Sequence, residues 1–259
     1  MPTSTTALPG LALRPASPTP SPAAATMLAA AVSAAPVPPF FLPEPLSLFD
    51  QGTVSCCVSC ALSGAMEVID RRSPGLSALF HYHVARVKQG MGGADGLLLI
   101  EEGAAVLEST GVCDHALHSF AISPETLSMS PSADAFRDAS NHLIRRVGLR
   151  FAIESISATA RAVDIRSRLL SGCPVVIGFR RPVEFPEGIL NSQFEWTDPL
   201  AGAGAIAGHC VLAYGFSDAR SAFRIRDSQG PNRFDQGGWW MSYSVANSAV
   251  VQSAFCLIP

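Results

Sequence analysis

The sequence has little charge: only 15% of its 259 residues are Asp, Glu, Lys or Arg, and the net charge is −3. It also lacks any basic cluster larger than a pair of arginines, which argues against a nucleic-acid groove or a patch for acidic membranes. No apolar run approaches the roughly 18 residues that cross a bilayer. Because 48% of the residues are hydrophobic, the chain can bury a sizeable core in one large domain or in two packed lobes.

The seven cysteines do not make the compact, even-numbered framework of a small disulfide-rich domain. Cys56, Cys57 and Cys60 stand close together, but no second Cys or His pair follows at a spacing that would complete the ~4 ligands of a zinc site. Residues 57–60 have C-x-x-C spacing without the βαβ surroundings of a redox motif. We therefore expect no metal and no cofactor, and we interpret Cys56 and Cys60 as small packing residues.

The N-terminal segment differs in composition from the rest of the chain. Residues 1–45 contain eleven prolines and only two charged residues, Arg14 and Glu44. Such a composition predicts disorder over about residues 1–40. The stretch 27–35 resembles part of a secretion signal but has no basic segment directly before it. A flexible tail or leader fits better, so the compartment stays open, with the cytoplasm slightly favoured over secretion.

Apolar periodicity predicts helices in the first half of the remaining chain and strands in the second half. The helices are expected from residue 57, over 76–88, over about 100–110 and over 160–170. The strands are expected over 174–179, 209–216, 222–227, 239–243 and 254–258. Helices followed by strands favour an α+β protein, with one domain over 41–259, a helical lobe over about 50–125 and a β lobe over about 145–259.

Cys57 would lie in the first turn of the first helix, away from the centre of its apolar stripe. Unpaired backbone N–H groups and the positive end of the helix dipole favour a thiolate at such a position. The thiolate, and not the thiol, is the nucleophilic form of cysteine. Gln51 lies just ahead of the helix, where its side-chain N–H₂ and the backbone N–H of Cys57 could form an oxyanion hole.

Two of the predicted strands can bring a histidine beside a carboxylate. If residues 217–219 form a three-residue hairpin loop, Leu212 faces Arg224 and His209 faces Asp227. A carboxylate in this position selects the histidine tautomer and favours the imidazolium, which in turn stabilises a thiolate. The pattern therefore predicts nucleophilic catalysis by a thiol with a base and an orienting group.

Several segments resemble the papain-like cysteine peptidases, especially their compact bacterial members. Segment 51–57 is similar to the Gln-Gly-x4-Cys region of that family, and 208–216 resembles its Gly-His-Ala-Val strand. Segments 226–231 and 235–243 resemble its Asn-Ser-Trp-Gly region and the terminal strand after it. The likeness covers about residues 40–259. It implies a two-lobe fold, with an N-terminal helical lobe, a C-terminal antiparallel β-barrel-like lobe and the active-site cleft between them.

The resemblance also implies roles for individual residues. Gln51 would be the oxyanion donor, Cys57 the nucleophile, His209 the general base and then acid, and Asp227 the orienting group. The reaction would be hydrolysis of peptide bonds through a thioester, by a monomer that acts on peptide or protein substrates. Two glycines would border the substrate, namely Gly96 and Gly208.

The chain departs from the family pattern at positions that leave other functions open. Asp227 stands where the family has Asn, and Val54 where it has a disulfide-forming Cys. Gln229 stands where it has a shielding Trp, which predicts a wetter His–Asp contact. One alternative is an acyltransferase or deamidase that uses the same thioester. Another is a degenerate peptidase that binds peptides without cleaving them.

Four further side chains are interpreted as structural and not as catalytic. His81 and His83 fall on opposite sides of one predicted helix and are expected to be surface or partly packed residues. Trp239 is assigned, with the Trp that follows it, to the core of the β lobe and the wall of the cleft.

Overall fold

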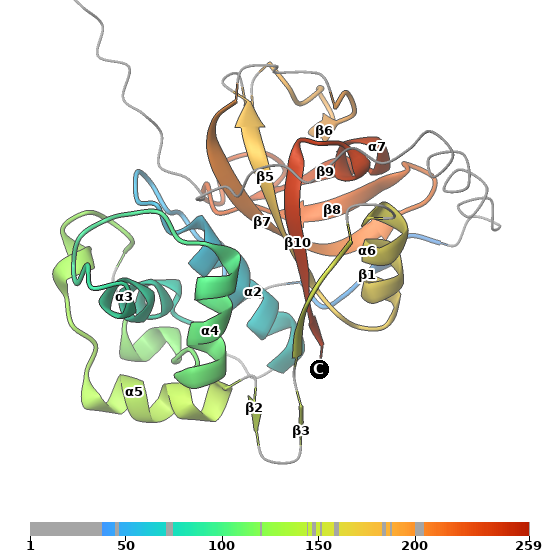
Figure 1. Cartoon of the computed structure of the whole chain (residues 1–259). Helices are drawn as coiled ribbons and strands as arrows, with labels where there is room; N and C mark the ends of the chain where they lie inside the picture. Colours follow the sequence, from blue (N-terminus) through green and yellow to red (C-terminus); the bar gives the residue numbers. More distant parts are fainter. Residues whose placement is uncertain are drawn as a thin grey trace, which may run out of the picture.

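Figure 1 shows the chain as a computed structural model, with most of the helices gathered to one side of a β-sheet. Of the segment predicted to be disordered, 1–40, residues 1–37 lie outside the described residues. No helix in the part that is described combines the length and the apolar composition needed to cross a bilayer. The structure describes residues 38–44, 47–70, 75–119, 121–143, 145–146, 149–150, 152–157, 161–182, 185–186, 188–199 and 205–258.

The α-helices form largely where apolar periodicity predicts them. They are α2 (Cys57–Asp70), α3 (Ala78–Lys88), α4 (Ile100–Ser109), α5 (Ala133–Ala139), α6 (Arg161–Leu170) and α7 (Tyr243–Asn247). Short 3₁₀ helices are η1 (His115–Leu117), η2 (Thr126–Ser128) and η3 (Ser140–His142). The pattern predicts α2, α3, α4 and α6 but misses α5 and α7, since a helix of one or two turns is too short to display a period.

Helix α2 is the centre of the helical side. It is buried on every face from Cys57 to Val68, because it packs against α3 and α4 on one side and against the longest strand, β7, on the other. Gly103 of α4 permits the close approach of the two helices, since a Cβ there would come within 2.6 Å of Cδ1 of Leu62. A helix surrounded in this way needs small or apolar residues on all faces.

The prediction that His81 lies at or near the surface is wrong. Its ring is fully buried between α2 and α4, where Nδ1 lies 2.9 Å from the Ser59 hydroxyl and Nε2 lies 3.0 Å from the carbonyl oxygen of Gly103. Burial lowers the pKa of His81 to about 4, so the ring is neutral and serves as a polar link within the core. His83 is partly buried, as predicted.

The strands form one large sheet and a small separate pair, β2 with β3. The large sheet runs β4-β10-β5-β7-β8-β9-β6, and β1 pairs with β7 outside this order. The strands are β1 (Phe40–Phe41), β2 (Arg145–Arg146), β3 (Leu149–Arg150), β4 (Ala152–Ser155), β5 (Val175–Pro182), β6 (Glu195–Trp196), β7 (Ala205–Ser217), β8 (Ala222–Arg226), β9 (Gly238–Ser242) and β10 (Val251–Ile258). All five predicted strands are present, as β5, β7, β8, β9 and β10.

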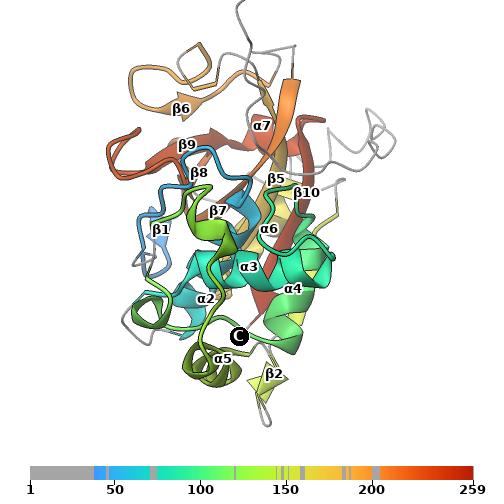
Figure 2. The ribbon, with the colours of Figure 1, turned by 90° about the vertical axis from the view of Figure 1, so that its left-hand side faces the viewer.

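The large sheet is open, whereas the resemblance implies a barrel-like antiparallel lobe. Its end strands β4 and β6 are not paired with each other in the described residues, and β6 runs parallel to β9. Figure 2 shows β6, β8 and β9 lying above helices α3, α4 and α5 in that view. The sequence predicts the helices-then-strands order correctly, but strand alternation alone cannot decide whether a sheet closes.

The predicted hairpin register between β7 and β8 is wrong. Ser217 pairs with Ala222, so the loop has four residues, and Leu212 pairs with Arg226 instead of Arg224. The register also shifts at Tyr214, which is an extra residue on β7. A bulge of this kind has no clear signal in an alternating sequence, because the residues on either side keep their apolar character.

Candidate active site

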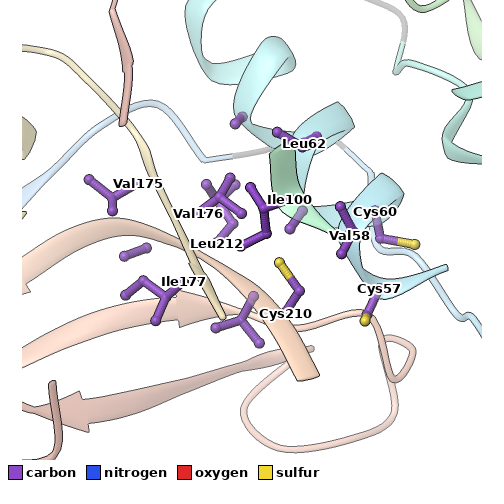
Figure 3. Close-up of a cluster of buried hydrophobic side chains, with 14 of the residues drawn as sticks. Cys57, Val58, Cys60, Leu62, Ile100, Val175, Val176, Ile177, Cys210 and Leu212 are labelled. Carbon is purple, nitrogen blue, oxygen red and sulfur yellow. The ribbon is translucent and has the colours of Figure 1, made fainter. Parts of the chain in front are cut away.

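Cys57 is the first residue of α2, as the sequence predicts, and its side chain is fully buried. Figure 3 shows it at the N-terminal end of α2, in the same cluster of buried side chains as Cys210 of β7. The N–H groups of the first helical turn have no intrahelical acceptor, so this end of the helix favours a negative charge.

The segment before α2 pairs with the loop after β8. The N–H of Gln51 donates to the carbonyl oxygen of Ser228 at 2.8 Å, and the N–H of Gly230 donates to that of Phe49 at 2.9 Å. These backbone hydrogen bonds join regions that are far apart in the sequence. They place Gln51 beside the residue that follows Asp227.

His209 and Asp227 make the contact that the sequence predicts, although by a different route. Nε2 of His209 lies 2.9 Å from Oδ1 of Asp227, and the two side chains are 1% and 0% exposed. If the register of β7 and β8 continued, Val211 would lie opposite Asp227, so the contact is diagonal. Diagonal neighbours on one face of a sheet remain within reach of long side chains.

Three N–H groups converge on the carboxylate of Asp227. Oδ1 accepts from Nε2 of His209 and from the backbone N–H of Ser228 at 2.7 Å, and Oδ2 accepts from Nε1 of Trp239 at 2.8 Å. A carboxylate offers only acceptors, whereas an Asn would turn an N–H₂ donor toward one of these donors. The donor set accounts for an Asp at this position.

The prediction of a wet His–Asp contact is also wrong. The ring of Phe179 lies edge-on to His209, with centroids 5.5 Å apart, and is 6.1 Å from the ring of Trp239. All of these side chains are buried. Aromatic residues from β5 and β9 thus exclude solvent, and no shielding side chain is needed at Gln229.

The protonation states of the pair follow from burial and mutual charge. Burial would lower the pKa of His209, but the charge and hydrogen bond of Asp227, together with Cys57, outweigh it and raise the pKa to about 9. For Asp227, burial would raise the pKa, but the His209 charge and the converging N–H donors lower it. These directions favour an imidazolium beside a carboxylate.

The second ring nitrogen of His209, Nδ1, does not take part in the contact with Asp227. Nδ1 is buried and has no hydrogen-bond partner among the described residues. Cys57 lies close enough to the ring to contribute to its raised pKa. Because the carboxylate of Asp227 accepts the proton on Nε2, Nδ1 is the ring nitrogen not engaged by this contact.

The side-chain amide of Gln51 is held in one orientation. Its Oε1 accepts a hydrogen bond from the hydroxyl of Ser228, and its Nε2 donates to the carbonyl oxygen of Val54 at 2.8 Å. An N–H₂ group has two protons, so one donor remains after this contact. Gln51 is 4% exposed, and its free donor is therefore held in a largely desolvated place.

The two glycines predicted to border the substrate lie on different elements. Gly208 precedes His209 on β7 and pairs with Arg180 of β5. Gly96 lies in the loop between α3 and α4, and its N–H donates to the hydroxyl of Tyr82 at 2.9 Å. Their role in binding substrate stays a prediction.

The cysteines next to Cys57 pack against each other. The Sγ atoms of Cys56 and Cys60 are 3.8 Å apart, and burial raises the pKa of Cys56 well above that of an ordinary thiol. Across the residues that the structure describes, no group of three or more His, Cys, Asp or Glu side chains could hold a metal ion.

Ser228 and Trp239 are the site residues that sequence reasoning missed. Ser228 binds both Gln51 and Asp227, and so links the two sides of the site. Its position within the segment 226–231 was a usable signal. Trp239 was expected in the core or the cleft wall, but its contact with Asp227 was not, because that contact depends on how β9 packs beside β8.

Comparisons with known proteins find a peptidase-like relative and cysteine proteases of similar fold, although no protein-family model matches the chain. A peptidase C1-like protein of Acanthamoeba polyphaga mimivirus, itself uncharacterised, is 26% identical over 223 residues. The match covers 84% of this chain and 71% of that protein.

Solved structures of cysteine proteases share the fold. Xylellain, a cysteine protease from Xylella fastidiosa, is 26% identical with a TM-score of 0.72, and the match covers 100% of this chain and 98% of that one. A cysteine protease of Carica candamarcensis has 12% identity and a TM-score of 0.56, with 82% of this chain and 93% of that chain covered. The latter likeness concerns the fold alone.

Proposed function

We propose that the chain, which is a papain-like cysteine peptidase, cleaves peptide bonds through a thioester on Cys57, with His209 as base and Asp227 as orienting group. The observation that carries this proposal is the buried imidazole of His209. Its Nε2 lies 2.9 Å from Oδ1 of Asp227, and its Nδ1 lacks a hydrogen-bond partner in the described part of the chain. Cys57 is near enough to contribute to the raised pKa of the ring.

The first half of the reaction forms the thioester. The Cys57 thiolate attacks the carbonyl carbon of the scissile bond, so that a C–S bond forms and the carbonyl oxygen becomes an oxyanion. The backbone N–H of Cys57 and the free Nε2 proton of Gln51 stabilise this charge. The imidazolium of His209 then gives its Nδ1 proton to the leaving amine as the C–N bond breaks.

The second half returns the enzyme to its starting state. His209, now neutral, takes a proton from a water molecule that attacks the thioester carbon. The C–S bond breaks, the acid product leaves, and the thiolate–imidazolium pair is restored. Asp227 keeps its negative charge throughout and holds the tautomer that presents Nδ1 to the reaction.

We also propose that the substrate lies between a helical lobe and the sheet. Cys57 and Gln51 belong to the helical side, whereas His209 and Asp227 belong to the sheet, so a peptide must touch both. Both backbone groups of Gly96 contact the Tyr82 hydroxyl, so a peptide N–H there would have to use the second lone pair of the Gly96 carbonyl oxygen.

The test is loss of peptide cleavage in Cys57→Ala, together with loss of covalent labelling by an epoxide or iodoacetamide probe. Cys60→Ala is the matched control, because it removes another buried thiol of α2, one whose Sγ lies 3.8 Å from that of Cys56. Full cleavage by Cys57→Ala would refute the proposal.

The acyltransferase or deamidase alternative loses its main support. An Asp at position 227 is explained by the three N–H donors around it and does not require transfer chemistry. Mass analysis of a glutamine-bearing protein substrate separates the two: backbone cleavage supports hydrolysis, whereas loss of ammonia or cross-linking supports transfer.

A further inference from the structure

A carboxylate from the loop between α3 and α4 binds the segment that leads into Cys57. Asp95 accepts hydrogen bonds from the backbone N–H of Ser55, at 3.0 Å on Oδ1 and 3.3 Å on Oδ2, and from the Ser55 hydroxyl at 3.0 Å on Oδ2. Ser55 is buried and lies two residues before Cys57. Forty positions separate Ser55 from Asp95 in the sequence, so this is a tertiary contact.

The same carboxylate is held by a tyrosine of α3. The hydroxyl of Tyr82 lies 2.6 Å from Oδ1 of Asp95 and 2.7 Å from the carbonyl oxygen of Gly96, and it accepts the N–H of Gly96 at 2.9 Å. One hydroxyl proton serves two acceptors, and the charged carboxylate is the stronger of them. Tyr82 thus ties Asp95 and Gly96 to the buried face of α3.

Arg86 of α3 also contacts the loop that carries Asp95. The guanidinium of Arg86 is buried, and its Nε donates to the carbonyl oxygen of Ala94 at 3.0 Å. A Cβ at Gly96 would collide with this guanidinium. The loop that carries Asp95 therefore has little freedom to move away from Ser55.

We propose that Asp95 is a positioning residue for the peptidase reaction. Asp95 and Tyr82 form a polar clip that holds the segment 52–56, and through it aims the backbone N–H of Cys57 and the amide of Gln51 at the oxyanion. The clip joins two loops without a covalent link, in a chain that has Val54 where a disulfide-forming Cys would be expected. This inference rests on the proposed function.

If Asp95 acted only through its charge, its removal would have a different effect on the reactivity of Cys57. A carboxylate this close to the start of α2 opposes a thiolate in the same segment, as its effect on the pKa of Cys56 illustrates. Removal of the charge would therefore leave alkylation of Cys57 unchanged or make it faster. Positioning predicts the opposite for acylation, which needs the oxyanion donors in place, whereas alkylation by iodoacetamide does not.

The experiment compares acylation with alkylation in Asp95→Ala. We expect kcat on a peptide substrate to fall by about 10- to 100-fold with a smaller change in KM, since a misplaced donor lowers the rate by up to about that factor. The rate of iodoacetamide labelling at Cys57 should not fall. Rates are normalised to the protein that remains folded by circular dichroism, so a loss of stability alone does not mimic the effect.

Two milder variants keep the test decisive if Asp95→Ala does not fold. Tyr82→Phe keeps the ring and the Ser55 contacts, and Ser55→Ala keeps the backbone contacts, so each should lower kcat less than Asp95→Ala but in the same direction relative to alkylation. Asp134→Ala removes an exposed carboxylate whose ion-pair partner among the described residues is Arg137; it is the control and should match the unmodified chain.

The outcomes separate this inference from the proposed function. Unchanged kcat in all three clip variants, or an equal fall in acylation and alkylation, would overturn the positioning role while Cys57→Ala stays inactive. Cleavage that survives Cys57→Ala would instead overturn the proposed function itself.

Discussion

The sheet side and the helical side of the proposed site differ in how their polar groups are held. On the sheet, His209 and Asp227 are 1% and 0% exposed, and aromatic rings surround them. The backbone of His209 is also fixed by pairing with Phe179 of β5. The charge and tautomer of the base are thus set within the core.

On the helical side, the segment before Cys57 lies partly at the surface. Gly52 and Thr53 are exposed, and the segment is held by a small number of hydrogen bonds, such as those between Ser55 and Asp95. A group held in a core resists displacement, whereas a loop held by a few hydrogen bonds can be moved by one substitution. We therefore expect changes on the sheet to alter proton transfer, and changes on the helical side to alter oxyanion stabilisation.

The largest effect is expected for His209→Ala, which removes the proposed base. The kcat/KM for a peptide should fall by roughly 10⁴-fold or more, as for loss of a member of a catalytic triad. Labelling of Cys57 by iodoacetamide near neutral pH should also slow, because the imidazolium no longer stabilises the thiolate. Normal labelling would show that the thiolate does not depend on the sheet side.

A smaller loss is expected for Gln51→Ala on the helical side. Removal of one oxyanion donor should lower kcat by about 10²–10³-fold and leave alkylation of Cys57 nearly unchanged. Gln229→Ala is the matched control, since it removes an amide side chain from the neighbouring segment. A Gln51→Ala enzyme as active as this control would remove Gln51 from the oxyanion hole.

The donor set around Asp227 predicts a coupled effect of about tenfold. Asp227→Asn places an N–H₂ group opposite one of the N–H donors, and Trp239→Phe removes one of these donors. Each variant should lower kcat/KM by roughly tenfold or less, which is about the effect of losing one hydrogen bond to a charged group. The double variant should be no worse than Asp227→Asn alone, because Phe no longer opposes the amide. Strict additivity in this double-mutant cycle would contradict the convergence of donors on one carboxylate.

The smallest effect is expected on how the stability of the fold changes with pH. The pKa of His209 is raised from 6.5 to about 9 by folding, so its stabilising contribution is complete below about pH 6.5 and is lost as the pH rises through about 9. The contribution of Asp227, whose pKa is lowered, is present above its ordinary value and is lost as the pH falls through the folded-state value. The midpoint of thermal unfolding should therefore decline across the alkaline range.

Asp227→Asn serves as the comparison for this decline. Without the carboxylate charge, the pKa of His209 should be lower, and the decline should be weaker or begin at lower pH. Identical pH profiles of the unfolding midpoint, measured by circular dichroism, would mean that the His209–Asp227 pair does not contribute to stability through its charge.

Cys57 and His209 could be predicted from the local sequence, because each lies in a segment with a recognisable pattern. The apolar stripe that begins near Cys57 predicts where α2 starts, and the start of a helix has the same electrostatic character in any fold. Alternation around His209 predicts a strand in the same way. The predicted hairpin then points to Asp227, the position just ahead of the helix points to Gln51, and the family likeness implies the same two residues.

The register and the closure of the sheet were not accessible in this way. A single extra residue at Tyr214 changes the pairing of every position beyond it, and the sequence around it looks like ordinary strand. The contact of His209 with Asp227 survived the wrong register only because diagonal neighbours on one face also meet.

By itself, then, the sequence determined the order of helices and strands, the helix start at Cys57 and the residues proposed as its partners. Only the tertiary structure decided that Trp239 and Ser228 surround Asp227, and that Asp95 binds Ser55. The physical reason is the range of the interactions: helix periodicity and dipoles act over a few neighbouring residues, whereas a hydrogen bond between distant loops depends on the packing of everything between them.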